Sequence, residues 1–125
     1  MKLISEILDL TDETAVTSSQ VSDQWPLCQG SFVHPIVLIE IVAQTAGVQI
    51  GWKKGTGKGG GGLGWIVGIK SADFFWDRIP HHTVLITTVK NLYSAENYNV
   101  VEGIVTAGAD LLGRIQLQVF HSQSY

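Results

Sequence analysis

The most constraining feature of the sequence is a long apolar segment from Pro35 to Trp52 that carries a single acidic residue. Its apolar residues recur at spacings of three and four, the period of an α-helix, and further apolar residues fill the other faces. Pro35 suits the first turn of such a helix, because its missing N–H would have no intrahelical partner there. At a rise of about 1.5 Å per residue the helix would be roughly 27 Å long. A helix that is apolar nearly all round is usually buried, so we expect it to lie against a sheet.

Strand-like segments lie on both sides of the predicted helix. Two runs, Leu3–Leu10 and Thr14–Val21, flank a polar turn and predict an opening hairpin. Four later runs, separated by short turns, predict strands at Trp65–Trp76, Thr83–Tyr93, Tyr98–Thr106 and Leu111–His121. This order predicts an α+β fold in which a six-stranded antiparallel sheet wraps one long central helix, with residues 1–125 forming one domain. That arrangement is the hotdog layout.

The composition supports a folded domain and removes several classes of function. Of the 125 residues, 45% are hydrophobic and 15% are charged, and the formal net charge is -3, which argues against disorder and against nucleic-acid binding. Cys28 is the only cysteine, so a disulfide scaffold and a zinc site are excluded, and we expect no metal and no cofactor. The chain shows no signal-peptide core and no apolar run of roughly 18 residues. We therefore expect a cytoplasmic protein that does not associate with membranes.

Two further features are weak signals for a bound group. A glycine-rich segment at residues 55–64 fits the pattern GxGxxG. A dinucleotide fingerprint follows a strand and opens a helix, whereas this segment follows a helix and precedes a strand, so we expect a mobile loop. His81 and His82 follow Pro80 in a predicted turn, and without a nearby cluster of carboxylates or cysteines they make a poor metal site.

Glu40 is the most informative single residue, because it lies in the otherwise apolar helix. A buried carboxylate is costly unless it is paired or neutralised. One interpretation is structural, with Glu40 on a solvated stripe together with Gln44, one helical turn further on. The other is functional, with apolar surroundings keeping the carboxyl protonated so that it acts as a general acid. Position alone leaves both interpretations open.

Three segments of the chain together form a recognisable pattern. The helix segment Pro35–Gly47 carries Glu40 and, four residues later, Gln44. A strand-like segment, Val67–Phe74, follows the glycine-rich region, and the turn Asp77–Pro80 leads into the next strand. In this order they resemble the central helix, the following strand and the next turn of the 3-hydroxyacyl-acyl-carrier-protein dehydratases, a family with the hotdog fold. The resemblance covers roughly residues 3–121.

The resemblance implies a division of labour between an acid and a base. In that family a Glu on the helix protonates the departing hydroxyl of a 3-hydroxyacyl thioester, and a His from the preceding segment removes the α-proton, the two residues coming from opposite subunits of a dimer. Glu40 is then the acid. His34 is the only nearby imidazole, so it is either the base or a helix-entry residue that caps or packs. The resemblance further assigns substrate contacts to Ile36, Val37, Gln44 and Gly68.

Two positions depart from the family pattern. Ser31 stands where the family has its His, and Pro35, which has no N–H, stands where the family has a Gly. The N–H groups of Ile36 and Val37 could still hold the thioester oxygen, since the first turn of a helix carries unpaired donors. The shortened pattern resembles a divergent branch found with aryl-polyene synthesis, in which activity depends on a partner subunit.

The function implied by this resemblance is a dehydratase-like lyase of fatty-acid or polyketide-type synthesis. Its substrate would be an acyl thioester on acyl-carrier protein or coenzyme A. We expect a homodimer, because the family closes an open sheet edge by pairing two sheets across a two-fold axis. One alternative is an acyl thioesterase, in which a carboxylate directs water at the thioester carbon. Another is a non-catalytic hotdog subunit that supports an active partner, which the missing His favours.

Overall fold

The computed structural model describes residues 2–53 and 65–121. Within these two ranges the chain forms one helix and two antiparallel sheets, of six and three strands. In chain order the elements are β1 (Glu6–Leu10), β2 (Thr14–Gln20), β3 (Cys28–Gln29), β4 (Phe32–Val33), α1 (Val37–Lys53), β5 (Trp65–Phe74), β6 (Ile79–Pro80), β7 (Val84–Ser94), β8 (Tyr98–Ala107) and β9 (Asp110–His121).

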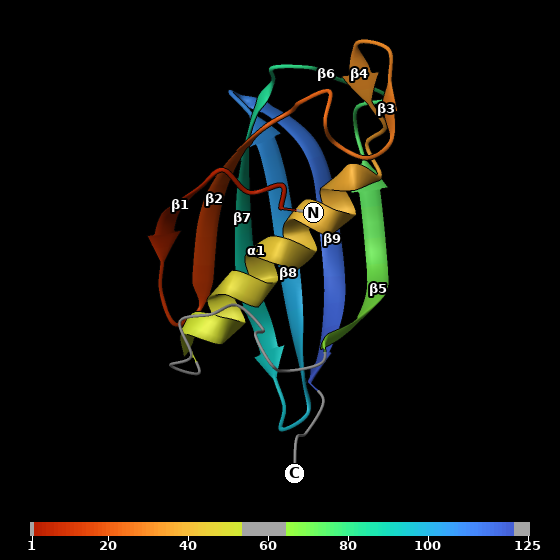
Figure 1. The fold of residues 1–125 in the computed structure, drawn as a ribbon. Coiled ribbons are helices and arrows are strands. Elements are labelled where there is room, and N and C mark those ends of the chain that lie inside the picture. The colour runs from red at the N-terminus through yellow and green to blue at the C-terminus, as the bar shows by residue number, and fades with distance from the viewer. Residues whose placement is uncertain (1, 54–64, 122–125) are drawn as a thin grey trace.

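The larger sheet has the strand order β1-β2-β7-β8-β9-β5, and every pair in it is antiparallel. The sheet curves, and α1 crosses its concave face (Figure 1). The predicted hotdog layout of one long helix and six antiparallel strands is therefore confirmed. In β9 the predicted alternation also holds, because Ile115, Leu117 and Val119 are buried while Gln116 and Phe120 are not.

The helix begins two residues later than the sequence predicts. Pro35 and Ile36 form a turn, and α1 starts at Val37. The N–H groups of Val37, Leu38 and Ile39 bond to carbonyl groups three residues earlier, at 3.1, 2.9 and 3.1 Å. This tighter hydrogen-bond spacing is typical of a 3₁₀ turn at a helix N-terminus. The backbone at the start of α1 is thus largely satisfied by the chain itself.

The smaller sheet, formed by β3, β4 and β6, was not predicted from the sequence. Each of its strands has two residues, which is too short for an alternating pattern to appear. Gly30 turns the chain between β3 and β4 with φ of 67°, a conformation that favours glycine. Two strands between β2 and α1 thus pair with β6 from the later part of the chain, and the smaller sheet lies near the N-terminal end of α1 (Figure 1).

Two strand glycines allow α1 to approach the larger sheet closely. The face of α1 toward the sheet is buried and includes Leu38, Ile41 and Val42. A Cβ atom at Gly103 would come within 2.5 Å of Val42, and one at Gly113 would lie 2.9 Å from Leu38. Side chains at these two positions would therefore push the helix away from the sheet.

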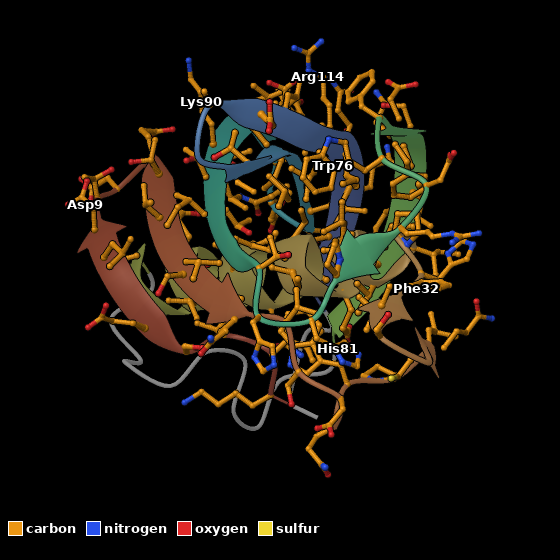
Figure 2. The ribbon with its side chains drawn as sticks, turned by 90° about the horizontal axis from the view of Figure 1, so that it is seen from above. Asp9, Phe32, Trp76, His81, Lys90 and Arg114 are labelled. Carbon is orange, nitrogen blue, oxygen red and sulfur yellow. The ribbon has the colours of Figure 1, made fainter. Side chains whose placement is uncertain are left out.

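The two sides of the curved sheet differ in character. Lys90 and Arg114 project from its outer side, whereas Trp76 lies on the inner side (Figure 2). Trp76 packs against the hydrophobic core, together with Phe74 and Ala72. The apolar interior is thus confined between the concave face, α1 and the segments that cover them.

Candidate functional site

An apolar cavity of about 900 Å³ lies along the side of α1 that faces away from the buried core. The helix contributes Ile39, Glu40, Ala43, Gln44 and Gly47 to its lining. These positions follow the three-and-four spacing of a single helix face. Further walls come from four other parts of the chain, through Lys2, Ile4, Pro26, Leu27, Val67, Ile69 and Val119.

The helix that is apolar nearly all round therefore has two different environments. The prediction that it is buried is confirmed for the face packed on the sheet. On the other face, Ile39, Ala43 and Val48 are half-buried and line the cavity. The second apolar face is explained by the cavity and not by a second layer of core.

Glu40 is an acidic residue on this cavity-lining face, in the first turn of α1. Its side chain is exposed in the single chain. Gln44, one turn further on, is half-buried, and its Oε1 accepts a hydrogen bond of 2.9 Å from the N–H of Leu3. The two residues share one stripe, as the structural interpretation expects, but this stripe borders an apolar cavity as well as solvent.

His34 lies at the entry to α1 and is exposed. Its Nδ1 accepts a hydrogen bond of 3.1 Å from the N–H of Ile36, and its own carbonyl accepts one of 3.1 Å from the N–H of Val37. An imidazole that accepts at Nδ1 carries its proton on Nε2 when it is neutral. The ring thus makes a contact that a helix-capping residue would make.

The N–H groups of Ile36 and Val37 are the sequence-predicted donors for a thioester oxygen. Both side chains line the cavity. Their N–H groups bond to the His34 ring and the His34 carbonyl, respectively. A substrate oxygen would have to displace one of these contacts to be held here.

Gly68 lies on β5 between two residues that line the cavity, Val67 and Ile69. Because successive positions of a strand face opposite sides, Gly68 faces the other side of the sheet. A Cβ atom there would lie 3.7 Å from Phe120 and 3.9 Å from Gln118. Gly68 therefore lies beside two residues of the cavity wall, but a side chain at this position would point away from the cavity.

The two adjacent histidines do not form a metal site with their neighbours. His81 Nε2 lies 3.2 Å from Cys28 Sγ, and its ring is 6.4 Å from that of His82, edge to face. Among residues 2–53 and 65–121, no group of three or more His, Cys, Asp or Glu side chains is placed to hold a metal ion. His81 lies near Phe32 at the smaller sheet (Figure 2).

Reasoning from the sequence missed most of the cavity lining, including all of the residues contributed by two segments outside α1 and the larger sheet. Lys2 and Ile4 precede the first strand, and Pro26 and Leu27 lie in the segment before the smaller sheet. Leu27 adopts φ of 62° and is 52% exposed. The sequence predicts Ile4 within the strand Leu3–Leu10, whereas β1 begins only at Glu6, and the segment with Pro26 and Leu27 carries no periodic pattern. No local signal therefore placed these residues beside α1.

Two further expectations concern the glycine-rich segment and the lack of a membrane-spanning helix. The glycine-rich segment lies outside the described residues, so its expected mobility stays a prediction. Within the described ranges, no helix is long and apolar enough to cross a membrane.

Comparison with solved structures supports the fold. A chain of the dehydratase heterocomplex ApeI:P from Xenorhabdus doucetiae superposes with a TM-score of 0.84 at 18% identity, covering 98% of this chain and 84% of that one. The protein smu.793 from Streptococcus mutans, bound to acetyl CoA, gives 0.72 at 12% identity, with coverage of 95% and 89%. A hypothetical thioesterase with coenzyme A from Streptococcus pneumoniae gives 0.68 at 16% identity, with coverage of 95% and 86%.

Comparison by sequence is more specific. No curated protein matches the chain. A family described as ApeP dehydratase, the ApeP-like family, matches residues 1–125, which is the whole chain. This agrees with the resemblance to dehydratases that Glu40, Gln44 and the following strand indicate. The chain is therefore a member of the ApeP-like dehydratase family and has the hotdog fold.

Proposed function

We propose that this chain dehydrates a 3-hydroxyacyl thioester and that Glu40 donates the proton to the departing hydroxyl. The observation that carries the proposal is the position of Glu40 at the edge of a cavity of about 900 Å³ with mostly apolar lining residues. A cavity of this size and character suits an acyl chain, with one polar group to direct the reaction. Gln44 is proposed to lie beside the bound chain.

The reaction needs two proton-transfer groups. A base removes the proton α to the thioester carbonyl, the C–O bond breaks, and an acid protonates the hydroxyl as it leaves as water. Glu40 and Lys2 are the ionisable side chains that line the cavity within the described residues. A lysine ammonium group is a hydrogen-bond donor without an acceptor site, so it does not suit the role of base. Among the described residues His34 is the candidate base of this chain, and we propose that the base is either His34 or a residue of a second chain.

We propose that a second hotdog subunit completes the site, either another copy or a different chain. The cavity of the single chain exposes Ile69, Leu27 and Ile36 at 56%, 52% and 45%. The strand β5, which carries Ile69, is at one edge of the larger sheet. The Xenorhabdus doucetiae neighbour is named as a heterocomplex, which supports a partner subunit for this chain as well.

The proposed substrate carrier is acyl-carrier protein or coenzyme A, and the proposed setting is fatty-acid or polyketide-type synthesis in the cytoplasm. Two of the structural neighbours are named with acetyl CoA or coenzyme A bound. Their identity to this chain is only 12% and 16%. Those names support a thioester ligand for this fold without choosing between the two carriers.

The experiment is a dehydration assay on the purified chain, alone and mixed with a second hotdog subunit. A 3-hydroxyacyl thioester is supplied, and both the enoyl product and any free thiol are measured. Enoyl product from the chain alone, or from the mixture in an amount that Glu40→Gln lowers, supports the proposal. Free thiol without enoyl product would replace it with the thioesterase alternative.

A supporting, non-catalytic role would give a different result. The chain would then be inert alone, and the Glu40→Gln variant would support full activity of the mixture. The engaged N–H groups of Ile36 and Val37 are the observation that favours this second candidate. The proposal requires that the variant lower the activity of the mixture.

A further inference from the structure

The N-terminal segment forms one wall of the cavity before the first strand begins. Lys2 and Ile4 line the cavity, and β1 starts only at Glu6. Leu3 and Ile4 are 2% and 8% exposed, and Leu3 belongs to the hydrophobic core. In Figure 1 this segment crosses α1 on its way to β1. A short stretch of chain outside the sheet therefore limits the space available to a ligand.

One side-chain contact ties this segment to the helix. The N–H of Leu3 donates to Oε1 of Gln44 over 2.9 Å. Only the oxygen of the Gln44 amide can accept this bond, so the contact also fixes the orientation of the amide. The next backbone bond along the chain, from the N–H of Ser5 to the carbonyl of Ser18, measures 2.8 Å and belongs to the hairpin.

The hydrogen bond between Leu3 and Gln44, called the tether below, lies on the face of α1 that carries the proposed acid. Gln44 follows Glu40 by one helical turn, and both line the cavity. Two contacts thus anchor the segment that carries Ile4: the burial of Leu3 in the core and the hydrogen bond to Gln44, one helical turn from Glu40. If Ile4 moved, the length of acyl chain that fits between Ile4 and the reacting group at Glu40 would change.

We propose that Gln44 is a positioning residue that holds residues 2–4 against α1, so that Ile4 sets the length of acyl chain the cavity accepts. The identity of the ligand rests on the proposed function, whereas the tether itself does not. In an apolar pocket one methylene changes the preference between ligands by roughly 10- to 200-fold. A displaced wall is expected to change chain-length preference on that scale.

Three variants separate the tether from the wall. Gln44→Met keeps the length of the side chain and removes the amide oxygen. Ile4→Ala keeps the tether and shortens the wall. Gln20→Met makes the same chemical change as the first variant on the exposed end of β2, outside the cavity, and serves as the matched control.

The first measurement is hydrogen exchange of the Leu3 amide by NMR, which needs no substrate. Protection is expected in the wild type, in Ile4→Ala and in Gln20→Met, and loss of protection is expected in Gln44→Met. An unprotected Leu3 amide in the wild type, or a protected one in Gln44→Met, would overturn the tether whatever the protein does.

The second measurement is the binding of butanoyl, hexanoyl and octanoyl thioesters of N-acetylcysteamine by calorimetry, to the chain alone and to its mixture with a second hotdog subunit. The ratio of octanoyl to butanoyl affinity should rise about tenfold in both Gln44→Met and Ile4→Ala, and stay unchanged in Gln20→Met. An unchanged ratio in Gln44→Met would overturn the positioning role. The wild type could bind none of these thioesters while Leu3 shows the expected exchange pattern. That result would support the contact between Leu3 and Gln44 and refute an acyl thioester as the ligand.

Discussion

Gly103 of β8 lies directly beneath Val42 of α1, so closely that a Cβ atom on residue 103 would sit 2.5 Å from each Val42 methyl carbon. Both positions are buried, and Val42 is 0% exposed. The branched Val42 side chain is short and attached near the helix backbone, so it cannot swing away from such a clash. The short distance between α1 and the sheet thus requires a residue without a side chain at position 103.

The first prediction concerns stability. Gly103→Ala should lower the free energy of unfolding by about 1–3 kcal/mol, the usual cost of overpacking a core. Gly47→Ala is the matched control, since a Cβ atom there meets nothing within 4 Å. In a helix interior that change should leave stability unchanged or raise it by about 0.5–1 kcal/mol. Urea unfolding monitored by circular dichroism measures both, and equal stabilities would refute the close-packing argument.

The second prediction concerns the volume of the cavity. Gly47 lines the cavity, and the space beside it is open. Gly47→Leu should therefore fill part of the acyl site and weaken octanoyl thioester binding by at least tenfold, with a smaller effect on butanoyl thioester. The thermal midpoint should not fall. Equal losses for both ligands, or none for either, would mean that the acyl chain does not lie against this face of α1.

The third prediction separates the two roles open to His34. An asparagine side chain can accept the Ile36 N–H bond as a helix cap but cannot act as a general base at neutral pH. We expect His34→Asn to keep most of the wild-type rate and stability, while His34→Ala loses about 0.5 kcal/mol of stability. A loss of roughly 10²-fold or more in rate for His34→Asn, with the fold intact, would instead assign the base to His34.

The fourth prediction concerns assembly. Ile69 is 56% exposed on the edge strand β5 and lines the cavity, so a second subunit that completes the site should bury it. Light scattering is expected to give the mass of two chains for the wild type. Ile69→Lys should give the mass of one, because burying an unpaired ammonium group is costly. A monomeric wild type, in the absence of any partner subunit, would rule out the homodimer.

Much of the fold was predictable because its signals are local. The three-and-four spacing of Pro35–Trp52 and the alternation of Ile115, Leu117 and Val119 each reflect which side of an element is buried. The smaller sheet was not predictable, because a two-residue strand such as Phe32–Val33 has no period. The close approach at Gly103 did have a signal, since a glycine inside a strand often marks one.

The candidate site was predictable only along the helix. Glu40 and Gln44 are one turn apart on a continuous element, so their common face follows from the sequence. Ile4 and Leu27 reach the cavity through segments without regular structure, and their placement depends on tertiary packing. The contact between the His34 ring and the Ile36 N–H depends on a side-chain torsion that the sequence does not encode locally.

The proposed role of Glu40 as the proton donor in a dehydration can be tested by one comparison. The rates of enoyl thioester formation are measured for the wild type and Glu40→Gln, each in the assembly that is active. Glutamine keeps the shape of the side chain and can still form hydrogen bonds, but it cannot give up a proton. The expected result is a fall of roughly 10²- to 10⁴-fold with unchanged thermal stability and assembly. A Glu40→Gln variant that dehydrates the substrate at the wild-type rate would show that Glu40 is not the proton donor.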